Sequence, residues 1–337
     1  MFQPIHILNT NSDDLKKYQE RWQTDRGKET QKYIIEQIKK GAGEDFLQYD
    51  FQSGKLSLLE NEWDLKGIEI WELDVDFPKN DTFEAIDFSY SRFWHSKFNH
   101  AAFVSGGGGI FARIYNCEFN HCLFYLNGWR GCTFEKVKFF KCDFMEHAYF
   151  VNCIFKDCVF TDCFLSEGIF SDCLFNVNTS INQLKYKTNN FGKHSLEKIN
   201  LPEIYKGIKD AYSSGEVYDK YRDYFYKQKA SETQYLKSGW PKLSAQIQES
   251  VTGYGIRPVR VLEWSIFVIL FFVNIYIYVF NLNIGTSFIS SLSAFATMGD
   301  VPSISWMSYF YVVESLLGIG FFALFITVLS NIWFGEK

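Results

Sequence analysis

Four consecutive residues, Thr297, Met298, Gly299 and Asp300, could present oxygen atoms to a cation. The apolar stretch that leads into them, residues 286–297, reads as a helix of about 18 Å, too short to cross a bilayer. Non-helical backbone at membrane depth is tolerated only where protein buries it or where it lines water. Carbonyl groups presented in that way replace the hydration shell of an ion. The pattern therefore predicts a re-entrant half-helix followed by non-helical backbone at membrane depth, the arrangement in which cation filters present carbonyl groups.

Two apolar segments flank this stretch and must position it. Residues 261–282 would form about 33 Å of helix, which matches a hydrocarbon core of roughly 30 Å. Residues 304–334 form a second span, whose only ionisable residue is Glu314. We expect this carboxyl group to support the pore helix rather than to contact ions. Four aromatic residues suit the membrane–water interfaces: Tyr276, Tyr278, Trp306 and Trp333.

Basic residues indicate the orientation of the two spans. Arg257 and Arg260 precede the first span, and Lys337 follows the second. Positive charge accumulates on the cytoplasmic side of spanning helices, so we expect both chain ends in the cytoplasm. Residues 1–11 lack a basic region followed by an apolar run, and no cleaved signal peptide is expected. The sequence thus predicts a multi-pass protein of the cell (inner or plasma) membrane.

Aromatic residues recur every five positions through the middle of the chain, far more often than the overall aromatic content of 19% would produce. The repeated positions are Phe83, Phe88, Phe93, Phe98, Phe103, Ile114, Phe119, Phe124, Trp129, Phe134, Phe139, Phe144, Phe150, Phe155, Phe160, Leu165, Phe170 and Phe175. A period of five fits neither a helix nor an alternating strand. It fits a square coil in which each five-residue face sends its central side chain inward.

The cysteines support the same coil. Each one lies two residues before a repeated position: Cys117, Cys122, Cys132, Cys142, Cys153, Cys158, Cys163 and Cys173. Such a second inward position requires a small apolar group, and a free thiol suits it. Spacings of five and ten residues differ from those of zinc sites, and we expect core packing rather than disulfides or metal ligands. The histidines at 95, 100, 121 and 147 fall off the inward positions and are expected at the surface.

Residues 63–177 resemble the pentapeptide-repeat family, and the resemblance rests on this five-residue period. It implies the family's fold, a right-handed quadrilateral β-helix. The run from Ser105 to Gly109 departs from the pattern. It lacks the Lys-Ser/Thr pair of a phosphate-binding loop, so we expect a flexible bulge there. Some members of the family resemble duplex DNA in shape and charge, but membrane attachment and modest charge disfavour that role here.

The segment after the short apolar helix resembles the pore of potassium-channel-like proteins with two transmembrane helices per subunit. In that family the pore helix ends in Thr-x-Gly-Tyr-Gly-Asp, often followed closely by Pro. The resemblance implies a homotetramer around a central pore, with a gating hinge at Gly318 and Gly320. Without the Tyr-Gly pair the filter holds fewer carbonyl rings, so we expect weak selectivity among monovalent cations and a ring of four attracting carboxylates. The matching run is Thr297-Met298-Gly299-Asp300-Val301-Pro302.

Four parts follow from these patterns. We expect an N-terminal helical cap at residues 1–60, which includes an amphipathic helix over residues 12–40, and a pentapeptide-repeat β-helix at 61–180. A helical linker follows at 181–256, and a two-helix transmembrane pore domain at 257–337. The predicted fold class is therefore multidomain: a β-solenoid, a helical linker and a two-span α-helical pore module with a re-entrant pore helix.

Composition excludes several functions. A net charge of −5 over 337 residues gives no basic surface for nucleic acid, so no nucleic-acid partner is expected. The sequence has no nucleophile–base pattern and no dinucleotide fingerprint, and we predict no enzyme activity, catalytic residue, cofactor or metal site. The leading hypothesis is a tetrameric cation channel in the membrane. Its cytosolic repeat domain would gate the pore or bind an unknown protein or ligand. The alternative is a membrane-anchored, non-conducting scaffold.

Overall fold

The computed structural model describes residues 20–40, 63–64, 67–76, 82–84, 86–87, 91–104, 108–110, 112–125, 127–145, 148–166, 169–185, 200–297, 299 and 305–334. Predictions that involve residues 1–19, Phe88, His147, Met298 or Asp300 lie outside this set, as do Val301, Pro302 and Lys337. The chain divides into two compact units, Met1–Phe225 and Tyr226–Lys337, and each is described by itself.

The first unit begins with helical residues 20–23 and helix α2 (Asp25–Lys40). This confirms the described part of the predicted N-terminal helix. Trp22 is buried and belongs to the same apolar core as the strands that follow. The helix therefore packs on the strand region rather than standing apart from it.

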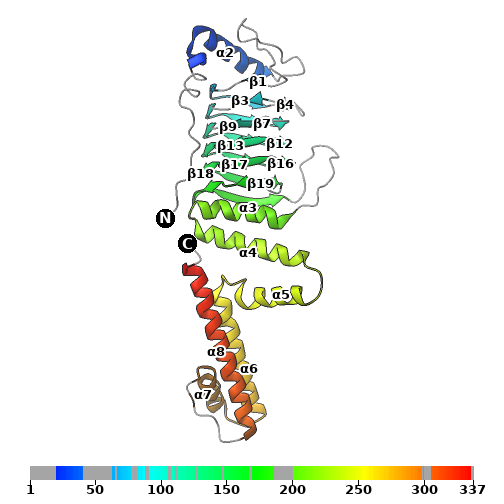
Figure 1. Cartoon of the computed structure of the whole chain (residues 1–337), viewed down its shortest axis with the longest axis vertical. Helices are drawn as coiled ribbons and strands as arrows, with labels where there is room; N and C mark the ends of the chain where they lie inside the picture. The colour runs from blue at the N-terminus through cyan, green and yellow to red at the C-terminus, as the bar shows by residue number, and fades with distance from the viewer. Residues whose placement is uncertain are drawn as a thin grey trace. The chain divides into compact units, whose positions relative to one another are not determined.

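Short parallel strands form four stacks (Figure 1). The first contains β1 (Trp63–Asp64), β5 (Ile86–Asp87), β9 (Gly108–Ile110), β13 (Gly128–Arg130), β17 (Tyr149–Val151) and β20 (Phe170–Ser171). The second contains β2 (Glu69–Trp71), β6 (Arg92–Trp94), β10 (Arg113–Tyr115), β14 (Thr133–Glu135), β18 (Ile154–Lys156) and β21 (Leu174–Phe175). Consecutive strands therefore belong to different stacks, and each stack gains one strand per turn of the chain.

The other two stacks are joined through one long strand, β19 (Val159–Leu165), whose two halves pair with different neighbours. The third contains β3 (Asp74–Asp76), β7 (Lys97–Asn99), β11 (Glu118–Asn120), β15 (Lys138–Phe140), the first half of β19 and β22 (Ser180–Lys185). The fourth contains β4 (Thr82–Glu84), β8 (Ala102–Val104), β12 (Leu123–Tyr125), β16 (Asp143–Met145) and the second half of β19, which pairs with the end of β22. The first unit is thus a β-solenoid, as predicted, while its right-handed sense stays a prediction.

Strand register explains the five-residue period. Phe119 pairs with Phe139, 20 residues later, and Phe139 pairs with Phe160, 21 residues later. Four faces of five residues therefore close one coil, and the extra residue marks the frame shift near residue 147. The ring centroids lie 5.2 Å apart for the first pair and 4.6 Å for the second, close to the spacing of neighbouring strands. The predicted central positions from Phe93 to Phe175 are all buried.

The corners of the coil need left-handed backbone. The residue two after a central position has positive φ, as at His95 (φ 50°), Lys136 (φ 56°) and Asp157 (φ 55°). The Lys136 amide donates a 2.8 Å hydrogen bond to the Lys156 carbonyl in the next coil, so the turn is tied to its neighbour. Asn, Asp and His tolerate this region better than most residues, which explains their frequency at corners. His95 is exposed as predicted, whereas His100 and His121 are half-buried and stack at 5.2 Å.

The glycine run is not a simple bulge. Gly108–Ile110 forms strand β9, and Gly109 pairs with Trp129 at a buried central position. The expectation of a flexible loop through Gly109 is therefore wrong for the described part of the run. Sequence reasoning missed this because Gly109 carries no side chain to continue the aromatic spacing. The Cys132 thiol donates to the Gly109 carbonyl at 3.1 Å.

All eight cysteines are free and buried, so the prediction of core packing is confirmed. Their thiols donate to carbonyl groups of the previous coil, as Cys142 does to Phe119 at 3.2 Å. Burial raises the pKa of the Cys117 and Cys158 thiols to about 12, since the thiolate would lose its solvation. These thiols are therefore inert packing groups rather than reactive ones.

Helix α3 (Leu201–Ser214) covers the last coil (Figure 1). Tyr212 is fully buried, and its hydroxyl donates to the Thr179 carbonyl at 2.9 Å. A Cβ atom on Gly215 would lie 1.8 Å from the Phe175 carbonyl oxygen, so only glycine allows this approach. The exposed edge of the final coil is thereby closed. Helix α4 (Tyr218–Tyr235) follows, and its Lys220 also donates to the Thr179 carbonyl, at 2.7 Å.

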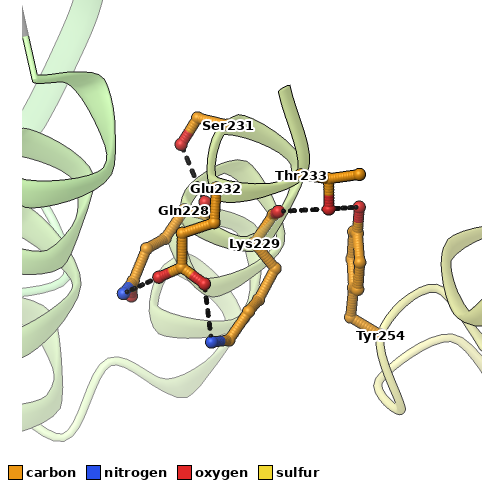
Figure 2. Close-up of polar contacts among 6 residues, drawn as sticks. All are labelled: Gln228, Lys229, Ser231, Glu232, Thr233 and Tyr254. Atoms are coloured by element: carbon orange, nitrogen blue, oxygen red, sulfur yellow. Dashed lines mark hydrogen bonds and ion pairs between the residues drawn. The ribbon is translucent and has the colours of Figure 1, made fainter. Parts of the chain in front are cut away.

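The second unit contains the end of α4 and four further helices, α5 (Trp240–Thr252), α6 (Pro258–Tyr278), α7 (Ile284–Phe295) and α8 (Ser305–Phe334). Figure 2 shows how residues near the end of α4 are held. Glu232 accepts hydrogen bonds of 2.8 Å from Gln228 and from Lys229. The Thr233 hydroxyl lies 2.9 Å from that of Tyr254, which joins α4 to the loop before α6.

Replacement of Phe139 by alanine tests the aromatic core. We expect Phe139→Ala to lower the free energy of unfolding by about 3–5 kcal/mol, because it removes a fully buried ring stacked on both neighbours. Urea denaturation of the full-length protein in detergent is monitored by the exposure of its cysteine thiols. Because all eight thiols lie in the solenoid, this signal reports on the unfolding of the solenoid alone. The adjacent exposed Lys138 pairs with Glu118 at the surface, and Lys138→Ala is expected to cost less than about 1 kcal/mol. Equal losses would contradict the inward assignment.

The buried thiols predict a dependence of stability on pH. Between pH 9 and pH 12 an unfolded chain loses thiol protons that Cys117 and Cys158 keep in the folded state. Their contribution to stability is therefore complete below about pH 9 and is lost progressively above it. Circular dichroism during urea denaturation at pH 8 and pH 10.5 measures this loss. Cys117→Ala replaces the thiol by the methyl group that Ala112 already has at the equivalent position of another face. This variant should show a weaker dependence of unfolding free energy on pH, and an unchanged dependence would contradict the prediction.

Candidate functional site

Two helices of the second unit could cross a membrane by length and composition. They are α6, with 21 residues, and residues 306–332 of α8. Within the most apolar stretch of each helix, only 22% and 17% of the residues are buried. The two helices therefore differ from the mostly buried core helices of a soluble protein. Large side chains such as Phe267, Leu270 and Phe322 lie exposed on them. These surfaces need an apolar environment outside the unit.

The short helix α7 lies alongside α6 and α8 rather than beyond their ends (Figure 1). Its Ser291 hydroxyl is 3.0 Å from the Ile269 carbonyl, nine residues before the end of α6, which is about 14 Å along that helix. The Ser315 hydroxyl donates to the Ala294 carbonyl at 2.9 Å, ten residues into α8. The helix therefore returns along the pair to near the middle of both.

One carboxyl group holds the three helices together. Glu314 of α8 is fully buried, and its Oε2 accepts a hydrogen bond of 2.9 Å from the Tyr276 hydroxyl of α6. Its Oε1 is bonded to the Ser291 hydroxyl of α7. Both oxygens are therefore occupied by neighbouring helices. A buried carboxyl group requires such partners, because burying an unpaired carboxyl group costs several kcal/mol of free energy, on the order of the desolvation penalty.

The face of α7 turned toward the helix pair carries small residues. Ser287, Ser291 and Ala294 are fully buried, at spacings of four and three. The opposite face exposes Ile289 and Leu292. Small residues let backbones approach closely, and the Ser291 hydroxyl bonds to both α6 and α8. Asn283 caps the start of α7, since its side-chain oxygen accepts the Thr286 amide at 2.9 Å.

Of the predicted filter, Thr297 and Gly299 are described. The Thr297 amide donates to the Ala294 carbonyl at 3.0 Å, and Thr297 has φ of 56°, an uncommon conformation for a β-branched residue. A Cβ atom on Gly299 would lie 2.2 Å from the hydroxyl of the buried Tyr311. The chain thus leaves α7 by a left-handed turn and passes against α8. Met298 and Asp300 lie outside the described residues.

The two glycines predicted to form a hinge differ in their surroundings. A Cβ atom on Gly318 would lie 1.9 Å from the Phe295 carbonyl oxygen at the end of α7. A Cβ atom on Gly320 would meet nothing within 4 Å. Gly318 therefore has a packing function that the sequence pattern did not reveal. A hinge at either position stays a prediction.

Sequence reasoning missed most of the contacts that hold α7. The assignment of Tyr276 to an interfacial belt is wrong, because this side chain is fully buried on Glu314; Tyr278 is exposed instead. Ser291, Tyr311 and Ser315 were not singled out. The spacing of Ser287, Ser291 and Ala294 was the available signal, but the partner helix could not be named from it. Within the described ranges no group of three His, Cys, Asp or Glu residues could hold a metal ion.

No family model matches the chain, and no curated protein matches it. Among solved structures, the chain is similar to a pentapeptide repeat protein (Rfr23) from the cyanobacterium Cyanothece 51142. That match has 9% sequence identity and a TM-score of 0.13, and covers 34% of this chain and 85% of the other. A similarity this weak supports no argument. The β-solenoid rests on the strand pairing of this chain alone.

The contrast between the two glycines predicts opposite effects of the same substitution. Gly318→Ala should separate α7 from α8 and lower the melting temperature of the detergent-solubilised protein, because the new methyl group would overlap the Phe295 carbonyl. Gly320→Ala should be neutral or stabilise by up to about 1 kcal/mol, since alanine favours helix and nothing obstructs it. Equal effects of the two substitutions on thermal denaturation would contradict the packing function of Gly318.

Proposed function

We propose that the chain is a subunit of a tetrameric membrane cation channel, weakly selective for monovalent cations. The observation that carries the proposal is the return of α7 along α6 and α8 to near their middle. If those two helices cross a bilayer, the end of α7 lies within its thickness. Irregular backbone at that depth requires protein or a water-filled path around it. Residues 297–300 follow α7 directly and form the filter in this proposal.

Glu314 acts as a support in this proposal. Both of its carboxyl oxygens already contact Tyr276 and Ser291, so neither is directed at a passing ion. The carboxyl group instead fixes the depth and direction of the pore helix. The small-residue face of α7 and the close approach at Gly318 act together with it. A rigid pore helix is what a filter built from backbone carbonyl groups requires.

Four copies around an axis would complete the pore. One unit supplies one strand of filter, which cannot surround an ion. Exposed apolar side chains on α8, among them Leu316, Ile319 and Phe322, provide surface for neighbouring subunits and for lipid. A ring of Asp300 carboxylates at the mouth would raise the local concentration of cations. In the proposed orientation both chain ends are cytoplasmic, and the solenoid gates the pore or binds a partner there.

The alternative is an anchored scaffold that does not conduct. The solenoid exposes Trp71, which stacks on Trp94 at 5.1 Å, and such a ladder gives it a surface for proteins. A scaffold needs only α6 and α8 as an anchor and needs no assembly. The mass of the detergent-extracted protein separates the two, because a channel must be a tetramer. A monomer or dimer would favour the scaffold.

Single-channel recording of the purified protein in planar bilayers tests conduction. We expect cation currents with similar permeability to Na⁺ and K⁺, and a lower conductance for Asp300→Asn, because four charges leave the pore mouth. The matched control is Glu263→Gln, which removes an exposed charge near the start of α6 and should leave conductance unchanged. Absence of current in the wild type at every voltage, with a subtetrameric mass, would refute the channel. Equal conductance of wild type and Asp300→Asn would remove Asp300 from the pore mouth.

A further inference from the structure

Helix α5, which precedes the first proposed span, has an apolar face that stays largely exposed among the described residues. Trp240, Leu243 and Ile247 are 78%, 47% and 51% exposed. Their spacings of three and four place them on one side of the helix. Large apolar side chains gathered on one helical face and left open indicate a surface that binds something.

The other side of α5 is already occupied. Glu249 lies two residues after Ile247, about 200° around the helix, and accepts a 2.7 Å hydrogen bond from the Tyr226 hydroxyl of α4. Its carbonyl also accepts a hydrogen bond from Arg260 of α6. The apolar face therefore points away from residues 226–235 of α4.

The position of α6 shows what the apolar face meets. The indole of Trp264, early in α6, donates to the Ser250 carbonyl at 3.1 Å, so the end of α5 lies beside the start of the span. Figure 1 shows α5 running across the direction of α6, with the end of α4 and the length of α6 on opposite sides of it. A membrane that α6 enters would begin at the level of α5.

The charge around this face fits a lipid surface. Between Glu232 and Glu249 the chain has no acidic residue, and it has two basic ones, Lys237 and Lys242. Amphipathic helices with basic flanks and a tryptophan on the apolar face bind in the headgroup region, and anionic lipids attract their lysines. Lys237 precedes the helix, and Lys242 lies on its polar side, seven residues before Glu249, where an interfacial helix carries its lysines.

We propose that α5 lies in the headgroup region of the bilayer, with Trp240, Leu243 and Ile247 inserted beside the acyl chains and with Lys237 and Lys242 on anionic headgroups. The inference rests on the proposed crossing of α6 but does not depend on conduction. The helix would then fix the depth at which α6 enters the bilayer. Its contacts with Tyr226 of α4 and Arg260 of α6 would hold the end of α4 at a fixed distance from the bilayer.

Fluorescent labelling of the full chain in vesicles tests this. The eight native cysteines are buried, so an environment-sensitive dye can be attached to one introduced thiol. Ile247→Cys places the dye on the apolar face, and Gln248→Cys, about 100° away on an exposed position, is the matched control. Leu270→Cys, exposed on α6, reports whether that helix is in the bilayer. The vesicles contain phosphatidylcholine and phosphatidylglycerol with nitroxide-labelled lipid.

We expect blue-shifted emission and several-fold stronger nitroxide quenching at residue 247 than at 248, with a weaker difference when phosphatidylglycerol is omitted. Equal, weak quenching at 247 and 248 together with strong quenching at 270 would overturn the inference and leave the membrane span intact. Weak quenching at all three would overturn both. Blue-shifted emission at 247 without nitroxide quenching would show that protein, such as a second copy, covers the face, and would equally overturn the lipid assignment.

Discussion

A single buried carboxyl group organises the second unit. Glu314 takes one hydrogen bond from α6 and one from α7, and so joins helices whose sequence positions lie far apart. Hydrogen bonds of this kind cannot be exchanged for water in an apolar surrounding, so the arrangement is specified as well as stabilised. Apolar contact alone is non-directional and would not fix the position of α7 along the pair. The position of α7 along the helix pair therefore depends on the position of Glu314 in α8.

The first unit obeys a different constraint, which is closure of the coil. Each described face has room for one large and one small inward side chain, and many described corners turn through a residue of positive φ. Backbone hydrogen bonds run from coil to coil, as at Lys136 and Lys156, so no strand depends on its sequence neighbours for pairing. Aromatic rings then stack because the register places them there. The stiffness of the solenoid follows from this repetition.

How far sequence could predict this structure depended on the range of the interactions. The five-residue spacing of Phe119, Phe139 and Phe160 is a local, repeated signal, and it predicted the solenoid and the burial of its cysteines. Gly109 escaped because a missing side chain leaves no signal. The lengths of α6 and α8 were equally readable. In contrast, the bond between Tyr276 and Glu314 joins residues 38 positions apart, and the residue spacing within either helix does not predict it.

The apolar side of α5 was overlooked for a related reason. Three large side chains in thirteen residues look like an ordinary core stripe until the structure shows that they remain about half or more exposed. The bonds of Glu249 to Tyr226 and to Arg260 also show that α5 is fixed to α4 and α6 rather than forming a plain linker before α6.

The approach of Gly318 to the Phe295 carbonyl has an evolutionary consequence. Glycine is the smallest residue, so every codon change that alters it adds bulk at a point where the structure leaves room for a hydrogen atom only. The residue at this position therefore cannot change through a series of gradually larger side chains. Descendants of the gene should either retain glycine there or alter the end of α7 in the same step, whereas packing within the unit sets no such limit at position 320, two residues further on.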